Sequence, residues 1–262
     1  MRALTAQELL DIWERGFAMT PIQRGLAFLT EACPEMTSQA LAELSIGQRD
    51  DLLLSLRERL FGAQVSGLAT CPKCGERLEL NFRVSDIRVA KNGKGDKGQG
   101  EGEFPNPYPL SPGSYPLSLE FPGFMVHFRI PNSLDLATIA GNQDLDQSRK
   151  MLLECCLKSV DAQGSPVAPS DLPMEVIEAV QERMAQVDPL ADIAFSLTCP
   201  SCSHQWQLLF DALTLLWNEI NAWAYRILRE VHILASAYGW READILSLSP
   251  WRRQAYLDMV GG

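Results

Sequence analysis

Two Cys-x-x-Cys pairs carry the most informative chemistry in this sequence. The first is Cys71 with Cys74 and the second is Cys199 with Cys202. Each pair has proline after its first cysteine, and each is followed by a stretch in which every second residue is apolar. Four thiolates fill a closed tetrahedral Zn²⁺ site. The two pairs therefore predict one structural zinc ion in a ribbon whose halves, each a turn followed by a strand, come from remote parts of the chain.

Two other interpretations of these cysteines are open. The pairs could be unrelated thiols, reduced or redox-active, although a thioredoxin-like pair precedes a helix and both pairs here precede a strand pattern. A catalytic zinc ion keeps one coordination position for water, which four cysteines would fill. His204, two residues after Cys202, is the alternative to one cysteine ligand, but we expect it to lie beside the site or on the surface.

The composition sets limits on partners and location. The chain has 262 residues and a formal net charge of −10, and zinc on four thiolates would make it more negative. Such a charge repels phosphate backbones, so we expect no nucleic-acid partner. No apolar run has the roughly 18 residues that span a bilayer, so no membrane contact is expected. The first residues lack the apolar core of a signal peptide, and the other cysteines (Cys33, Cys155 and Cys156) show no disulfide pattern. We therefore expect a cytoplasmic protein.

The first 62 residues are predicted to be helical. Thr5 with Glu8, and Ser45 with Gln48, form the pattern of a capping box at the start of a helix. Pro21 is predicted to begin a further helix between them. The apolar residues of these segments are expected to form core.

The C-terminal region is predicted to form one long helix. Asp211 can cap its start, and Gly239 can end it after Tyr238. A short helix is predicted to begin at Ser249 and Pro250. Apolar residues of the long helix recur at alternating spacings of four and three, which predicts a seam for packing on another helix. The seam residues are Leu213, Trp217, Ile220, Ala224, Ile227, Val231 and Leu234.

The middle of the chain is predicted to combine a hairpin with helices. Residues 118–121 and 125–130 alternate in polarity around a Pro-Gly turn, which predicts an antiparallel hairpin. Helices are predicted over residues 144–160 and 175–187. Glycine and proline are concentrated in residues 91–116, a composition typical of a flexible linker.

These patterns predict an α+β protein that is mainly helical, with a discontinuous four-cysteine zinc ribbon and a small antiparallel β element. The predicted organisation has five parts. They are an N-terminal helical region (1–65), the ribbon (66–90 plus 190–210), the flexible linker (91–116), the hairpin and helices inserted in the ribbon (117–189), and the C-terminal long helix with short helices (211–262).

The sequence contains no recognisable catalytic motif. We find no Gly-x-Ser-x-Gly elbow, no Walker loop and no His-Glu-x-x-His, and the chain has only three histidines. The three cysteines outside the two pairs lie in stretches that are predicted to be helix core. We therefore predict a protein that is not an enzyme and that has no small-molecule substrate.

Aromatic residues near the C-terminus are predicted to bind a protein partner. Five of the six tryptophans lie from position 206 onward. Trp, Tyr and Arg dominate the hot spots of protein interfaces, although a local aromatic core is the alternative. The predicted partner-binding residues are Trp240, Trp251, Arg252, Arg253 and Tyr256.

The two ends of the chain resemble a known family. The run Glu230–Leu257 and the opening Leu4–Gly16, with Pro21 and Arg24, resemble the small baseplate proteins of contractile phage tails and phage-tail-like contractile injection systems. These include the group related to the T4 baseplate hub-assembly chaperone, in particular its members with zinc knuckles. The resemblance implies a non-enzymatic protein that assembles the baseplate hub or forms part of it, with baseplate, hub or spike proteins as partners.

Two other functions are alternatives to this one. A zinc-ribbon regulatory or nucleic-acid-associated adaptor would need a segregated basic face, and the basic clusters of this chain are small. A zinc-stabilised enzyme with an unrecognised site would need a deep polar pocket away from the four cysteines.

Overall fold

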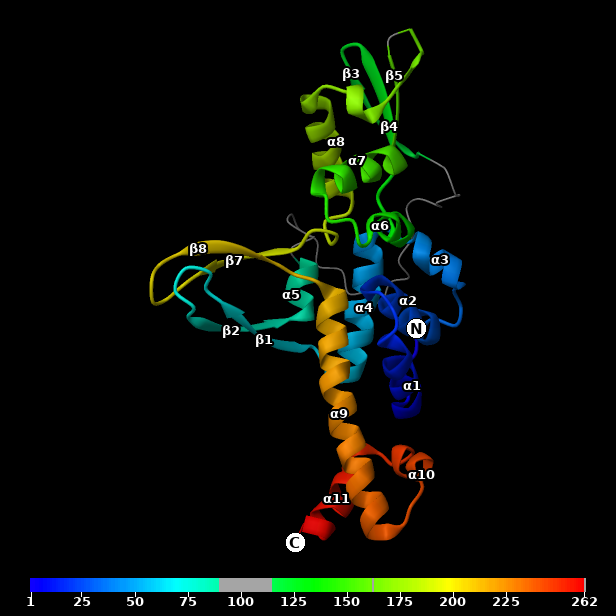
Figure 1. Ribbon diagram of the computed structural model, residues 1–262, viewed down its shortest axis with the longest axis vertical. Helices are drawn as coiled ribbons and strands as arrows, with labels where there is room; N and C mark the ends of the chain where they lie inside the picture. The colour runs from blue at the N-terminus through cyan, green and yellow to red at the C-terminus, as the bar shows by residue number, and fades with distance from the viewer. Residues whose placement is uncertain (90–114, 162, 262) are drawn as a thin grey trace. The chain divides into compact units, whose positions relative to one another are not determined.

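The computed structural model describes residues 1–89, 115–161 and 163–261. These residues form helices and three small antiparallel sheets, so the predicted α+β, mainly helical class is confirmed (Figure 1). Nearly all of the predicted linker, 91–116, lies outside the described residues. The chain divides into two compact units. Unit 1 contains Met1–Ser38, Leu53–Gly62 and Asp211–Gly262, and unit 2 contains Gln39–Leu52 and Ala63–Phe210.

Unit 1 is built from helices. They are α1 (Ala6–Gly16), α2 (Pro21–Ala32), the C-terminal part of α4 (Ile46–Phe61), α9 (Ala212–Tyr238), α10 (Glu242–Leu246) and α11 (Pro250–Gly261). Thr5 and Glu8 form the capping box of α1. Asp211 accepts two backbone N–H bonds at the start of α9, and Gly239 ends that helix with a φ of +68°. Among the described helices, none combines the length and hydrophobicity that crossing a bilayer requires.

The apolar face of α9 forms the core of unit 1. All the predicted seam residues from Ile220 to Leu234 are buried. Nearer the start of α9 the prediction is wrong by one position, because Ala212 and Leu216 are buried while Leu213 and Trp217 are half-buried. The latter two side chains pack against glycines of α2 and α1. Because α9 packs against α1, α2, α10 and α11, its apolar face is wider than a seam of one residue per turn.

Unit 2 contains a four-stranded antiparallel sheet in the order β3-β4-β5-β6. Its strands are β3 (Leu117–Phe121), β4 (Phe124–Phe128), β5 (Leu157–Asp161) and β6 (Pro166–Val167). The predicted hairpin is confirmed as β3 and β4. Within β4, Val126 and Phe128 are buried and His127 is exposed. Helix α8 (Met174–Val187) contributes Val176 and Val180 to the same core.

The structure corrects one predicted helix. The helix predicted over 144–160 is α7 (Leu145–Cys156), and the next five residues form strand β5. Strand β5 pairs with β4 in a register that places Ser159 opposite Val126. This non-local pairing supplies backbone hydrogen bonds and buries alternate residues. These contributions outweigh the small differences in helix propensity between residue types.

Unit 2 also contains the N-terminal part of α4 and several short helices. The predicted capping box of Ser45 and Gln48 is present at the start of α4, with both reciprocal hydrogen bonds formed. Asn132 caps α6 with its side-chain oxygen. The short helices are α3 (Ser38–Glu43), which begins at the last residue of unit 1, α5 (Val84–Val89), α6 (Ser133–Ile139) and the 3₁₀ helix η2 (Pro169–Asp171).

The packing of α9 can be tested at Leu234, which is fully buried. Leu234→Ala removes apolar contacts and leaves a cavity, so we expect the free energy of unfolding to fall by about 2–5 kcal/mol. Denaturant unfolding measures this loss. The control is Leu145→Ala, at a residue that is 83% exposed, with an expected change below about 0.5 kcal/mol. Equal losses in the two variants would contradict the described core.

The capping box of α1 predicts a pH dependence. Arg2 donates to both carboxylate oxygens of Glu8, at 2.9 and 2.7 Å, and the backbone N–H of Thr5 donates at 2.8 Å. These bonds lower the pKa of Glu8 to about 2. Because the pKa is depressed in the folded protein, the stabilisation is present above the ordinary pKa near 4.5 and is lost as pH falls toward 2.

Glu8→Gln should therefore weaken the dependence of the free energy of unfolding on pH between about pH 6 and pH 3. Denaturant unfolding at the two pH values measures this. Glu14→Gln, at an exposed position of the same helix, is the control and should behave as the unmodified protein does. A Glu8 variant with an unchanged pH dependence would contradict the capping contact.

Candidate metal centre

The two cysteine pairs lie in the turns of two similar hairpins within unit 2. The first hairpin joins β1 (Gln64–Thr70) to β2 (Arg77–Arg83), and the second joins β7 (Ala194–Thr198) to β8 (Gln205–Leu209). Strand β1 precedes the first pair and was not predicted. In both turns the backbone N–H of the first cysteine donates to the residue five positions later, at 2.8 and 2.9 Å. The repeat seen in the sequence is therefore also a repeat of backbone geometry.

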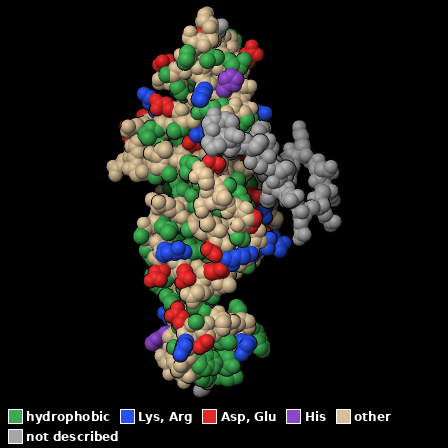
Figure 2. All heavy atoms as spheres, turned by 90° about the vertical axis from the view of Figure 1, so that its right-hand side faces the viewer, with side chains coloured by type: hydrophobic (Ala, Val, Ile, Leu, Met, Phe, Trp, Pro, Cys, Tyr) green, Lys and Arg blue, Asp and Glu red, His purple; other side chains and the backbone are tan. Residues whose placement is uncertain are grey.

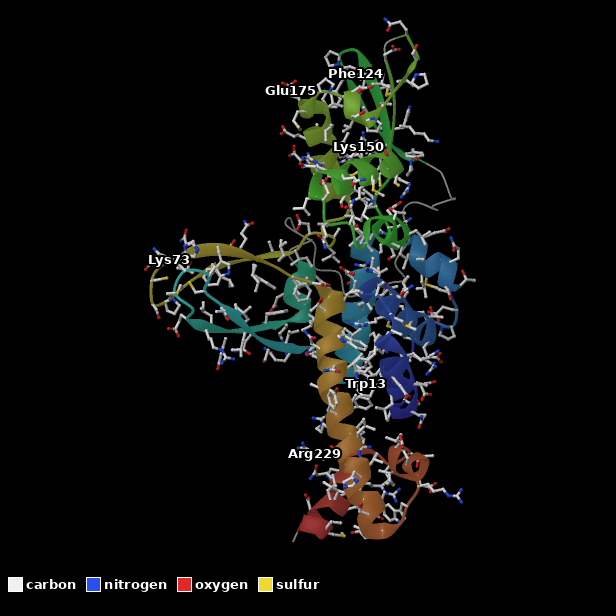
Figure 3. All side chains as sticks on the ribbon, viewed as in Figure 1. Trp13, Lys73, Phe124, Lys150, Glu175 and Arg229 are labelled. Atoms are coloured by element: carbon white, nitrogen blue, oxygen red, sulfur yellow. The ribbon has the colours of Figure 1, made fainter. Side chains whose placement is uncertain are left out.

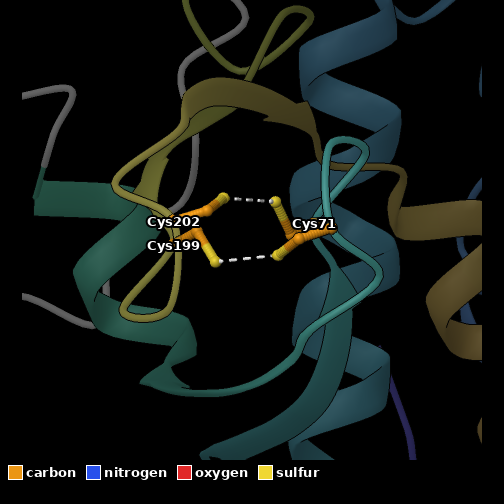
Figure 4. A group of neighbouring side chains, drawn as sticks. Cys71, Cys199 and Cys202 are labelled. Carbon is orange, nitrogen blue, oxygen red and sulfur yellow. Dashed lines mark hydrogen bonds between the residues drawn. The ribbon is translucent and has the colours of Figure 1, made fainter.

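The four sulfur atoms of these turns meet. Cys74 Sγ lies 3.5 Å from Cys199 Sγ, and Cys71 Sγ lies 3.7 Å from Cys202 Sγ (Figure 4). All four sulfurs lie within 4.8 Å of one another. A tetrahedron of sulfurs about 2.3 Å from a central zinc ion has edges of about 3.8 Å, whereas a disulfide bond is about 2.05 Å long. The donor set and its spacing therefore fit one tetrahedral metal ion.

The hydrogen bonds of the turns act unequally on the thiols. Burial opposes ionisation of Cys71, but hydrogen bonds from the backbone N–H groups of Cys74 and Lys73 outweigh it and lower the pKa of Cys71 to about 7. The backbone N–H of Glu76 favours the Cys74 thiolate, but the neighbouring thiols, Cys202 first, and burial raise the pKa of Cys74 to about 12. Thiols this close cannot all ionise without a cation, which a divalent metal ion would supply.

Apolar contacts hold the two hairpins together at a distance from the cysteine turns. The rings of Phe82, Phe195 and Phe210 contact one another, with centroids 5.0, 5.9 and 5.8 Å apart. Near the cysteines, Ser201 Oγ donates to the Glu76 carboxylate at 2.9 Å. These contacts and the sulfur cluster join two hairpins that come from distant segments of the chain.

The alternative ligand, His204, is not among the clustered ligand atoms of the described residues. Its ring stacks on Trp206 of β8, with centroids 6.1 Å apart and planes inclined by 10°. Of the cysteines outside the cluster, Cys33 and Cys156 are buried and Cys155 is half-buried. Burial raises the pKa of Cys156 to about 12, which suits a packing role rather than a reactive one.

The structure separates the five residues predicted to bind a partner. Trp251 is 81% exposed and Arg252 is exposed beside it. Arg253 is buried, and its guanidinium pairs with Glu230 at 2.6 Å. Trp240 and Tyr256 are half-buried and contact each other edge-on, with centroids 4.8 Å apart. These last two rings pack against the core of unit 1, so among the five only Trp251 and Arg252 are exposed.

Sequence reasoning missed a second group of aromatic side chains in unit 1, which is only partly buried. Trp13 projects between α1 and α9 (Figure 3), where its ring contacts Phe17 and Tyr225 edge-on. Trp217 contacts Phe17 in turn and carries the Arg24 guanidinium 4.2 Å from its ring centroid. Phe17 and Tyr225 are exposed. The available signal was the i, i+4 spacing of Trp13 and Phe17 on one helix face.

One comparison with known proteins identifies a family. A family model described as "T4 bacteriophage base plate protein" matches residues 21–217, about three quarters of the chain. The matched residues include both cysteine pairs and the four-stranded sheet. No curated protein and no solved structure matches the chain.

The repeated turn gives a test of its backbone geometry. Gly75 and Ser203 follow the second cysteine of each pair, and both have positive φ, +78° and +56°. This region costs a residue with a side chain roughly 1–2 kcal/mol relative to glycine. We expect Ser203→Gly to raise the free energy of unfolding by up to about 1 kcal/mol and Gly75→Ser to lower it by about 1 kcal/mol. Denaturant unfolding of both variants measures the changes, and shifts of the same sign would contradict the turn geometry.

Proposed function

Because the chain belongs to the family of T4 bacteriophage base plate proteins, we propose that it assembles, or forms part of, the baseplate of a contractile phage tail or a related injection system. The match over residues 21–217 carries this proposal. The chain would act through contacts with other baseplate components, with hub or spike proteins as the expected partners. It would act in the cytoplasm of the cell that builds the particle and either remain in the particle or leave as an assembly chaperone.

The proposed role is non-enzymatic. The sequence lacks the catalytic motifs considered above, and the net charge of −10 disfavours a nucleic-acid partner. A member of a baseplate family needs stable surfaces for neighbouring subunits rather than a reaction centre. This supports protein–protein contact as the activity.

The cysteine cluster would hold one structural Zn²⁺ through Cys71, Cys74, Cys199 and Cys202. The ion would supply no reaction chemistry, because four cysteines leave no coordination position for water. Its binding would contribute roughly 10–16 kcal/mol at neutral pH, as in zinc-finger peptides. The cost of closing a long loop grows only with the logarithm of its length, so one ion can join hairpins whose cysteines are 125 residues apart.

Purification from the native host tests the baseplate role. A tagged chain isolated gently from cells that produce the particle should bring down baseplate subunits, which mass spectrometry would identify. Recovery together with tube and sheath proteins would indicate a particle component, and recovery of hub or spike proteins alone would indicate a chaperone. Recovery of nucleic acid or polymerase subunits without any baseplate subunit would overturn the proposal.

Metal analysis tests the zinc role. The purified chain should contain one zinc ion, and Cys199→Ser should lower both the zinc content and the melting temperature. Cys155→Ser is the matched control, because this half-buried thiol lies outside the cluster. A Cys199 variant that lost zinc and kept full thermal stability would show that the site is not structural.

A further inference from the structure

Backbone groups, rather than charges, single out an open surface on this protein. Figure 2 shows Asp and Glu side chains interspersed with Lys and Arg side chains over one face, so charge favours no particular partner there. The edge of a β-sheet is more selective, because its free N–H and C=O groups are spaced to pair with another extended strand. The edges of the three described sheets differ in how well they are protected against such pairing.

The edge formed by β1 has free backbone groups along its length. At one end of the β1–β2 hairpin the backbone N–H of Val84 donates to the carbonyl of Ala63. At the other end the N–H of Cys71 donates to the carbonyl of Glu76. The register between these pairs is one-to-one, so alternate residues of β1 point their N–H and C=O groups away from β2. Their backbone groups have no partner in the described part of the chain. These residues are Gln64, Ser66, Leu68 and Thr70.

The two edges of this hairpin carry different side chains. The outward positions of β2 include three exposed charged residues, Arg77, Glu79 and Arg83. Charges of this kind discourage an edge from pairing with a further strand. Strand β1 has neither a charged residue nor a proline among its seven residues, and its Leu68 is 57% exposed. Of the edge strands in the four-stranded sheet, β3 carries a glutamate and β6 a proline.

A glycine at the centre of β1 has no reason within the described fold. Gly67 lies opposite Leu80 in the one-to-one register, so it belongs to no bulge, and its φ is not positive. A Cβ added to it would meet nothing within 4 Å. Glycine weakens a strand and often marks a bulge, a tight bend or the close approach of another backbone. Because no bulge or positive φ accounts for Gly67, we interpret it as a place for another backbone. Strands β7 and β8 are also uncharged but contain no glycine.

We propose that β1 docks an extended strand of another baseplate subunit, which lies beside it as a third strand with its backbone close to Gly67. This inference rests on the proposed baseplate function and specifies its partner surface. On the face where Gly67 lacks a side chain, Val65 and Ala69 are buried and Leu80 is half-buried. The partner residue opposite Gly67 is therefore apolar, and its side chain fills the space that the glycine leaves.

The pattern of free groups selects protein over nucleic acid. Main-chain hydrogen bonds along an edge need donors and acceptors that alternate at the spacing of a strand, which a phosphate backbone does not provide. The opposite face of β1 is polar at three of its four outward residues, so the docked strand alternates apolar and polar side chains. A third strand also stabilises the hairpin, because a sheet of two strands is marginally stable by itself.

Photo-crosslinking in the particle-producing host tests which molecule lies on this edge. Leu68→p-benzoylphenylalanine places a reactive group at the outward side of β1. The control has the same residue at Leu145 in α7, which is 83% exposed. We expect position 68 alone to yield a crosslink to another baseplate subunit, within a peptide of alternating apolar and polar residues.

The captured subunit, once purified, allows a titration against the full chain with two matched variants. Ser66 and Asn81 face each other across the hairpin and share one side-chain hydrogen bond of 2.7 Å. Each points its backbone N–H outward, so Ser66→Pro and Asn81→Pro both keep the bonds between β1 and β2 and both lose the side-chain bond. We expect Ser66→Pro to weaken binding at least about 10-fold and Asn81→Pro less than about 3-fold.

A third variant separates docking from folding. Gly67→Val adds a side chain that favours strands in a space that the chain leaves open, so its melting temperature should not fall. It should nevertheless weaken binding at least about 10-fold, because it occupies the place of the partner's side chain. Amide hydrogen exchange measured by NMR should slow at Ser66 and Leu68 when the subunit is added, which docking through side chains alone would not cause.

Several results would overturn the inference. They are the lack of a crosslink from position 68 to a baseplate subunit, equal losses of binding for Ser66→Pro and Asn81→Pro, or unchanged exchange in the complex. A crosslink to nucleic acid, to a second copy or within the same chain would contradict it as well. A lower melting temperature for Gly67→Val would show that the fold itself needs the glycine. If the chain still copurified with baseplate subunits in those cases, the docking edge would be wrong and the proposed function would stand. If no baseplate subunit copurified at all, the proposed function itself would fail.

Discussion

The meeting of four thiols at the tips of two hairpins is the constraint on which the ribbon of unit 2 depends. An isolated two-stranded hairpin is marginally stable at best in water, and each hairpin here forms a sheet of only two strands. The phenylalanine contacts and the sulfur cluster are the places where the two hairpins support each other. Sulfurs this close repel one another when ionised, so all four could be thiolates together only with a cation bound among them.

Unit 1 is stabilised in a different way. Its core is the apolar face of one helix, α9, which packs against helices from both ends of the chain. Capping side chains and a left-handed glycine define the ends of this helix. Burial of Arg253 against Glu230 fixes α11 on α9, and this leaves Trp251 on the outer side. The same helix thus has one side chain that is buried in an ion pair and another that is exposed.

The parts predicted well depend on neighbours in the sequence. Capping boxes at Thr5 and Ser45, the start of α9 at Asp211 and its end at Gly239 each rest on residues within a few positions of one another. The hairpin of β3 and β4 is equally local. Strand β5 was predicted as the end of a helix because its partner, β4, lies far away in the sequence, and a single strand carries little intrinsic preference.

Four features could be predicted from the sequence alone: the two cysteine pairs, the capped ends of α1, α4 and α9, the mainly helical α+β class, and the resemblance at the two ends of the chain. Each depends on residue types at short spacings. The tertiary structure decided which sulfurs face each other and which of the C-terminal aromatic and arginine side chains are buried. Arg252 and Arg253 are neighbours of the same type, yet one is exposed and the other buried. Successive residues point about 100° apart around a helix. The packing of α11 on α9 therefore decides that Arg253, and not Arg252, is buried against Glu230.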